Sequence, residues 1–161
     1  MSARDPLAYS ECSCSHTHCV GLTRDGRAFT WALTSQGNRF GQLCAPPPLP
    51  PAAAALAGDA IYVPREVRIG QRVVAVGAGG GRSAGHTALV AEDGALFMCG
   101  CDRWQQLGLS ALKRSIGSNA AGYAWDGGKI WQGEPQRVAA LSGVKIAKVW
   151  HGASTSAPAC G

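Results

Sequence analysis

Residues 86–99 read HTALVAEDGALFMC, and residues 18–31 read HCVGLTRDGRAFTW. Aligned from their first residues, the two stretches share a histidine, an Asp-Gly pair and a phenylalanine. Self-similarity of this kind is the signature of a repeat protein, and here it decides the fold class. The identical pairs are His18 and His86, Asp25 and Asp93, Gly26 and Gly94, and Phe29 and Phe97.

Each stretch places Asp-Gly between two runs of mostly apolar and β-branched residues. Asp-Gly supplies the positive-φ positions of a two-residue hairpin turn. The sequence therefore predicts two β-hairpins, 19–23 with 27–31 and 87–91 with 95–99. Within them we interpret the aspartates as turn formers and not as catalytic acids.

The repeat continues beyond the hairpins. FGQL at 40–43 has a counterpart in QQLG at 105–108, and residues 63–79 resemble residues 134–152. Residues 63–79 and 134–152 are each predicted to begin with a strand that a proline leads. Proline suits the first residue of a strand or a sheet edge. They end in the apolar runs VVAV and VKIAKV, which are typical of buried strands. Four short strands in a unit of about 50 to 70 residues are typical of a propeller blade.

The predicted fold is therefore all-β: a partial β-propeller of short, antiparallel, four-stranded blades in an open arc. The whole chain, 1–161, is interpreted as a single region of propeller repeats. Its expected divisions are a first repeat at about 9–44, a Pro/Ala-rich loop at 45–60, a second repeat at 61–111, a loop at 112–129 and a third, incomplete repeat at 130–161.

Composition and charge limit the partners and the compartment that are expected for the protein. The net charge of +5 is scattered along the chain, which predicts a solvated surface, with an acidic partner or nucleic acid as the weaker alternative. Seven cysteines without an apolar leader favour reduced thiols inside the cell, in cytoplasm or nucleus, with an organelle as a further alternative. No run of about 18 apolar residues occurs, so no membrane span is expected.

These landmarks resemble the repeat of the regulator of chromosome condensation family. That repeat runs Gly-x-x-His-(Ser/Thr)-x-Ala-Leu-Thr-x-Asp-Gly-x-Val-(Tyr/Phe)-x-Trp-Gly, then Gly-Gln-Leu-Gly, then Pro-x-x-Val. HTALVAEDGALFMCG and QQLG carry it well, and HCVGLTRDGRAFTWA and FGQLC carry it with lapses. The resemblance covers most of the chain outside the two long loops and implies a seven-bladed β-propeller. The structural repeat positions are His18, Asp25, Gly26, Trp31, Gly41, Gln42, His86, Asp93, Gly94, Gln106 and Gly108.

Several positions depart from the pattern. Ala32 replaces a glycine, Cys99 a tryptophan, Gln105 the glycine of the turn, and Thr155 the histidine of the third unit. About two and a half blades cannot close a ring, and an open arc leaves edge strands bare. We therefore expect a fragment of a longer product or a truncated paralogue. The alternatives are completion by a partner or another copy, and an unstable gene product.

Residues 11–20, ECSCSHTHCV, concentrate potential zinc ligands. In a strand, Cys12, Cys14, His16 and His18 share one face, about 7 Å apart, so they cannot surround one zinc tetrahedrally. His18 is explained by the repeat, which leaves Cys12, Cys14 and His16 as weak metal candidates. No metal or other cofactor is predicted. GAGGGRSAG at 77–85 lacks the spacing of a dinucleotide or phosphate loop.

The expected function is that of a non-catalytic protein–protein interaction module that presents blade loops to a partner. Aromatic and basic residues in the loops form the candidate partner surface, because both types are enriched at interface hot spots. The resemblance implies one alternative, part of a guanine-nucleotide exchange factor for a small GTPase with chromatin association. A zinc-binding accessory subunit of a larger complex is another. The candidate surface comprises Arg103, Trp104, Lys113, Tyr123 and Trp125.

Overall fold

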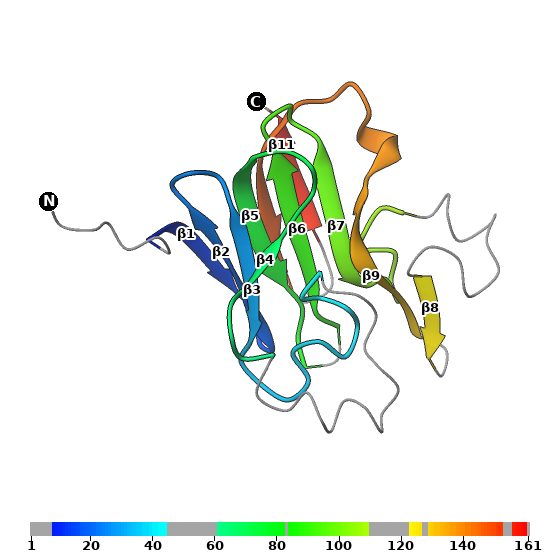
Figure 1. Ribbon diagram of the computed structural model, residues 1–161. Coiled ribbons are helices and arrows are strands. Elements are labelled where there is room, and N and C mark those ends of the chain that lie inside the picture. Colours follow the sequence, from blue (N-terminus) through cyan, green and yellow to red (C-terminus); the bar gives the residue numbers. More distant parts are fainter. Residues whose placement is uncertain are drawn as a thin grey trace, which may run out of the picture.

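The computed structural model describes residues 8–44, 61–82, 84–109, 123–126, 129–152 and 156–160. These residues form three antiparallel sheets and one short 3-10 turn, Ala139–Leu141, so the predicted all-β class is confirmed (Figure 1). None of the helical residues in the described segments forms a helix long and apolar enough to cross a membrane.

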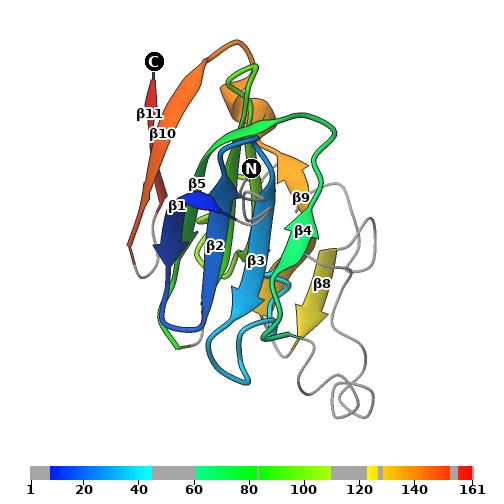
Figure 2. The same cartoon turned by 60° about the vertical axis from the view of Figure 1, so that its left-hand side comes forward.

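The first two sheets are complete blades, and the third has two strands in the described part of the chain. The first sheet has the order β1-β2-β3-β4, and its four strands lie side by side in Figure 2. The second has the order β5-β6-β7-β9-β8, and β10 pairs with β11 in the third. The strands are β1 (Tyr9–Cys14), β2 (His18–Thr23), β3 (Ala28–Ala32), β4 (Arg65–Val67), β5 (Val73–Gly79), β6 (His86–Ala91), β7 (Leu96–Cys101), β8 (Tyr123–Asp126), β9 (Lys129–Arg137), β10 (Ile146–His151) and β11 (Ser156–Cys160).

Both predicted hairpins are present, as β2–β3 and β6–β7. Their turns differ from the expected two-residue form, because the amide of Thr23 bonds the carbonyl of Arg27 and leaves three residues, 24–26, in the loop. Gly26 has a φ of +85°, and its N–H donates to the Thr23 carbonyl at 3.0 Å. This is a turn followed by a left-handed glycine bulge, which needs one positive φ where the expected turn needs two. The loop at 92–94 repeats it, with Gly94 at +85°.

The sheets and the sequence repeats are offset from one another. The proline-led strand β4 falls within the second repeat of the sequence, but it pairs with β3 and completes the first sheet. Likewise, β9 lies in the segment assigned to the third repeat and pairs with β7 of the second sheet. In the first two sheets, the strand that pairs with the outer strand of the hairpin therefore arrives after a long connection.

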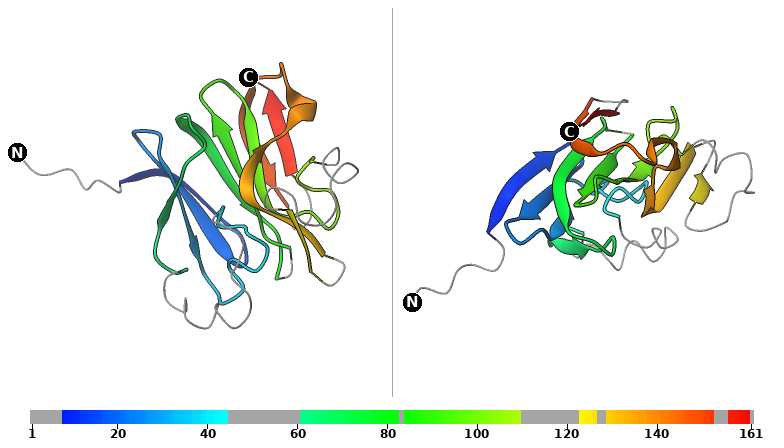
Figure 3. Two further views of the ribbon diagram at one scale, coloured as in Figure 1. Left: turned by 45° about the vertical axis from the view of Figure 1, so that its right-hand side comes forward. Right: turned by 90° about the horizontal axis from the view of Figure 1, so that it is seen from above.

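The first strand of each sheet (β1, β5 or β10) shows that the third sheet repeats the arrangement of the first two. β5 contacts both β1 and β10, and the three sheets stand next to one another when seen from above (Figure 3). Each of these first strands has a register shift at the same step of its pairing with the next strand. The shifts lie between Tyr9 and Glu11, between Val73 and Ala75, and between Ile146 and Lys148.

Two apolar layers hold the sheets together. The first lies between the first and second sheets, where Val20 and Leu22 of β2 meet Val76 and Leu89. The second lies between the second and third sheets and joins residues of β5, β6 and β7 to Ile146 and Val149 of β10. Burial of these branched side chains, at about 25 cal/mol per Å² of apolar surface, is the main force that sets the blades against one another.

Candidate functional site

His18, the first of the repeat histidines, joins two blades. Its Nε2 lies 2.7 Å from Oγ1 of Thr87 on β6, and its Nδ1 lies 2.7 Å from Oγ of Ser15. The Thr87 hydroxyl donates to the carbonyl of Gln42 at 2.7 Å. Its oxygen therefore accepts from His18 Nε2–H, and this network assigns the neutral tautomer. Burial, then the nearby His86 and His151, lower the pKa of His18 to about 3.

His86 and His151 form a second pair, between the second and third sheets. Their ring centroids are 5.1 Å apart, at an interplanar angle of 58°. The imidazole of His151 lies over Gly77 and that of His86 against Gly79, where any side chain would collide with the rings. Burial, and then His86, lower the pKa of His151 to about 4. In the described structure the two rings therefore pack between the second and third sheets, and the lowered pKa keeps His151 neutral at physiological pH.

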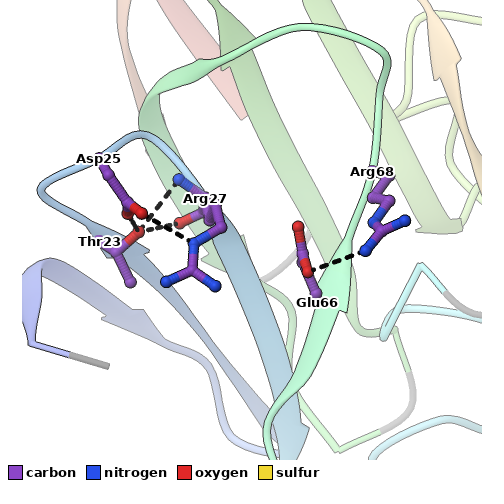
Figure 4. A network of polar contacts seen from close by, with 5 residues as sticks. All are labelled: Thr23, Asp25, Arg27, Glu66 and Arg68. Atoms are coloured by element: carbon purple, nitrogen blue, oxygen red, sulfur yellow. Dashed lines mark hydrogen bonds and ion pairs between the residues drawn. The ribbon is translucent and has the colours of Figure 1, made fainter. Parts of the chain in front are cut away.

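The aspartates of the two hairpins hold their turns. Asp25 accepts from the hydroxyl of Thr23 and, at 2.9 Å, from Nε of Arg27 (Figure 4). Asp93 accepts from the backbone N–H of Ala95 at 2.9 Å. The hydrogen bond from the Thr23 hydroxyl is the largest cause that lowers the pKa of Asp25. The hydrogen bond from the Ala95 amide is the largest cause that lowers the pKa of Asp93, and both carboxyls are exposed. Each carboxylate therefore bonds within its own hairpin turn.

The same hairpin tips border a shallow groove that sequence reasoning missed. It is lined by the first turn, by β4 and by the segment that leads into β5. Arg27, Arg68 and Arg72 stand around it with Asp25 and Glu66, and Arg68 pairs with Glu66 at 3.3 Å (Figure 4). The one available signal was the arginine-rich segment REVRIGQR after Pro64, whose place beside the Asp-Gly turn depends on the β3–β4 pairing.

The turns that contain Gln42 and Gln106, which we call the first and second glutamine turns, are built alike. In the first, Gln42 Oε1 accepts from the amide of Phe40 at 2.8 Å, and Asn38 Oδ1 accepts from the amide of Leu43 at 3.2 Å. In the second, Gln106 Oε1 accepts from the amide of Trp104 at 2.9 Å, and Asp102 Oδ1 from the amide of Leu107 at 3.0 Å. Polar side chains, of which Gln42, Asp102 and Gln106 are buried, therefore fix the course of each turn. Gln42 and Gln106 thus make equivalent contacts in the two turns.

The second glutamine turn presents the described part of the candidate partner surface. The indole of Trp104 is 50% exposed, and the guanidinium carbon of Arg103 lies 5.2 Å from its centroid. Lys113 lies outside the described residues. Tyr123 and Trp125 lie in β8, and their side chains are outside the described part of the structure. We call the pair Arg103 and Trp104 the Arg-Trp tip.

Replacing Gln105 with glycine is expected to stabilise the protein by about 1 kcal/mol. Gln105 has a φ of +63°, a left-handed conformation that costs a residue with a side chain roughly 1–2 kcal/mol. Its counterpart in the first turn is Gly41, with a φ of +70°. Urea denaturation of wild type and Gln105→Gly measures the difference. An unchanged or lower free energy of unfolding for the variant would contradict this reading of the turn.

The cysteine-rich stretch at 11–20 does not form a metal site in the described structure. Cys14 and Cys19 face each other across β1 and β2, with Cα atoms 4.1 Å apart, and form a disulfide. Cys12 is exposed, and partial burial of its thiol, followed by the nearby charge of Glu11, raises the pKa of that thiol. The higher pKa disfavours the thiolate that zinc requires. No cluster of three or more potential ligands occurs among the described residues.

The pairing of cysteines also corrects the expectation of reduced thiols. Besides Cys14–Cys19, a disulfide joins Cys44, after the first glutamine turn, to Cys99 on β7. Neither pair is visible in the sequence, because Cys14–Cys19 depends on strand register and Cys44–Cys99 on the contact between two blades. Disulfides persist in oxidising compartments and are reduced in the cytosol.

Mass spectrometry after alkylation without reductant is expected to leave these four cysteines unlabelled and to label Cys12 and Cys160. The latter two are free and exposed, whereas disulfide sulfurs do not react with the alkylating reagent. Labelling of Cys14 or Cys44 in unreduced, folded protein would contradict the pairing. Labelling of all seven after reduction and unfolding is the control.

No protein family and no curated protein matches the sequence. The structure, however, is similar to solved propellers. With Prp20p from Saccharomyces cerevisiae it shares 16% identity over 98% of this chain and 32% of Prp20p, at a TM-score of 0.65. With human WBSCR16 it shares 19% identity over 89% of this chain and 29% of that protein, at a TM-score of 0.59.

A third match is a structure of Kap60 bound to yeast RCC1 (Prp20), with 19% identity over 94% of this chain and 30% of that one, at a TM-score of 0.61. The chain thus spans about a third of the length of the solved proteins it matches. At such identities the likeness shows the fold, and it confirms the predicted partial propeller of the regulator of chromosome condensation type.

Proposed function

We propose that this chain is a non-catalytic interaction module that presents blade loops to a protein partner. The observation that carries the proposal is the Arg-Trp tip. A half-exposed indole stands beside a guanidinium on a turn that the side chains of Asp102 and Gln106 hold in place. Tryptophan and arginine are the residues most enriched at interface hot spots. A turn that is already ordered binds without a large loss of conformational entropy.

The buried histidines support a non-catalytic role. Both ring nitrogens of His18 are hydrogen-bonded, one to Ser15 and one to Thr87. The low pKa of His18 keeps the ring neutral at physiological pH. A general base needs a pKa near the working pH and access to a substrate proton. His18, buried between two blades, has neither.

A second candidate function is a contribution to guanine-nucleotide exchange on a small GTPase. What favours it is the likeness to Prp20p, whose structure was reported together with its binding to Gsp1p and histones. The net charge of +5 suits an acidic partner surface. An assay of labelled-nucleotide release from a small GTPase, with and without this protein, tests it. No acceleration at saturating protein would rule out exchange activity by this chain.

The Trp104→Ala variant is expected to lose at least about tenfold of its partner recovery, since a central hot spot contributes roughly 2 kcal/mol or more. Quantitative cross-linking of the tagged protein in its native cell extract compares the variant with wild type. The matched control is Trp150→Ala, because Trp150 is also exposed, at 55%, but lies on β10 of the third sheet. Equal recovery by wild type and Trp104→Ala would contradict the proposed surface.

A further inference from the structure

Two cysteines stand where the sequence repeat has other residues, and in the structure their sulfurs meet. Cys44 ends the first glutamine turn, at the position that Gly108 occupies in the second. Cys99 stands on β7 at the position that Trp31 occupies on β3. The disulfide between Cys44 and Cys99 joins the first turn to the second sheet. The two departures from the repeat are therefore a single feature of the fold.

The second glutamine turn shows that a turn of this shape does not require the bond. The amide of Cys44 donates to the carbonyl of Gly41 at 3.0 Å, and the amide of Gly108 donates to the carbonyl of Gln105 at 3.1 Å. The φ angles are also alike, +52° for Cys44 and +66° for Gly108. The second turn thus follows the same course with a glycine and no sulfur at this position. We therefore expect the first turn to form whether or not the disulfide is present.

The disulfide holds Cys44 in a backbone conformation that suits glycine better, because a Cβ is crowded at this positive φ. When the bond opens, no covalent link keeps Cys44 in that conformation. The residues before it stay in place, since the hydroxyl of Thr30 donates to the carbonyl of Leu43 at 2.6 Å. The hydroxyl of Thr87 likewise donates to the carbonyl of Gln42 at 2.7 Å. The bond therefore controls the end of the turn and not the whole of it.

The two ends of the bond differ in their access to solvent. Cys44 is partly exposed, whereas Cys99 is 0% exposed. The free thiol of Cys101 lies two residues further along β7 and so shares a face with Cys99, but it is buried, and burial raises its pKa. Since the attacking species in disulfide exchange is a thiolate, Cys101 is a poor nucleophile for this bond. Attack by an external thiol on the sulfur of Cys44 is the favoured route.

We propose that the Cys44–Cys99 disulfide is a redox-sensitive latch between the first two sheets, opened by a dithiol reductant at the sulfur of Cys44. A thiolate of the dithiol attacks Cys44, forms a mixed disulfide and releases Cys99, which takes up a proton. The second thiol of the reductant then attacks the mixed disulfide, so that the dithiol becomes a disulfide and Cys44 becomes a thiol. Two electrons and two protons pass to the protein, and a disulfide oxidant of the same class reverses the exchange.

Opening of the latch is expected to loosen the end of the first turn without unfolding the blades. The apolar layer between the first two sheets does not depend on the bond, because its buried members are all aliphatic. Phe40 likewise keeps its contacts with Cys101 and Trp131 of the second sheet. Both redox states are therefore folded, and they differ in how firmly Cys44 is held. The inference does not depend on the Arg-Trp tip, which lies on the other glutamine turn.

Thiol trapping and amide hydrogen exchange of the purified full chain test the latch. The protein is equilibrated with increasing dithiothreitol in the absence of denaturant, and free thiols are alkylated and identified by mass spectrometry. Alkylation of Cys44 is expected while far-ultraviolet circular dichroism is unchanged and the amides of Leu89 and Val90 on β6 stay protected. Exchange of the amide at position 44 is expected to accelerate by about tenfold on reduction and to slow again after treatment with oxidised dithiothreitol.

The variants Cys99→Ala and Cys44→Gly remove the latch and keep the Cys14–Cys19 disulfide. In both, exchange at position 44 should no longer respond to dithiothreitol, and Cys44→Gly carries the residue of the second turn, which favours folding. A response that persists in both variants would come from Cys14–Cys19 and would overturn the proposal.

Two results with wild type would also overturn it. One is alkylation of Cys44 only under conditions in which Leu89 and Val90 lose their protection, because the bond would then be a fixed structural link. The other is equal exchange at position 44 in the oxidised and reduced protein.

Discussion

Replacing Gly100 with alanine is expected to lower the free energy of unfolding by about 3 kcal/mol or more. Gly100 has a φ of +107°, and a left-handed conformation alone costs a residue with a Cβ about 1–2 kcal/mol. A Cβ at this position would also lie 2.5 Å from the carbonyl oxygen of Gly85 and 2.6 Å from Cα of His86. Both neighbours are backbone atoms at the start of β6, so they can move only with the strand.

The Gly143→Ala variant is the matched control, because it separates the backbone cost from the collision. Gly143 has a φ of +86°, and an added Cβ there meets no atom within 4 Å. Its loss is expected to stay near 1 kcal/mol. Urea denaturation of both variants, analysed with a common slope, measures the difference. Equal losses would show that the chain around Gly100 relaxes at no cost and would contradict the packing at the start of β6.

The local part of the fold was predictable because it depends on residues that are close in the sequence. Asp25-Gly26 and Asp93-Gly94 place a tight turn between two apolar runs, and both hairpins are present. The loop length was wrong by one residue, since Asp-Gly suits both a two-residue turn and a turn with a glycine bulge. The choice between them depends on how the flanking strands pair, as in the bond from the Thr23 amide to the Arg27 carbonyl.

The nonlocal part of the fold was not predictable from the same pattern. β4 pairs with β3 across the long Pro/Ala-rich segment, so the proline-led strand had no visible preference for one blade over the next. The disulfide Cys44–Cys99 needs two blades to meet. Phe40 and Trp104 are both aromatic residues ahead of a glutamine. Phe40 is buried because Cys101 of β7 and Trp131 of β9 pack against its ring, and this contact between two sheets is not visible in the sequence.

Lowering the pH from 7 to 5 is expected to reduce the free energy of unfolding by about 2 kcal/mol through His18 and by a similar or smaller amount through His151. Their pKa values in the folded protein are about 3 and about 4, against an ordinary value of 6.5. Between these limits the unfolded chain binds more protons than the folded one, so stability falls as the pH falls. The stabilisation is complete above pH 6.5, and for His18 it is lost progressively down to about pH 3.

The His18→Gln variant is expected to show a clearly smaller loss between pH 7 and pH 5, whatever its stability at pH 7. The amide cannot take up a proton in this range, but it can still donate to Thr87 and so keep the link between the blades. The matched control is His16→Gln, which makes the same substitution at an exposed position on the turn just before β2. Urea titrations at each pH give the slopes. If the free energy of unfolding of His18→Gln fell with pH as steeply as that of wild type, protonation of this buried imidazole would not cause the wild-type loss. The difference between the two variants therefore tests whether the repeat histidine is held neutral by the contact between neighbouring sheets.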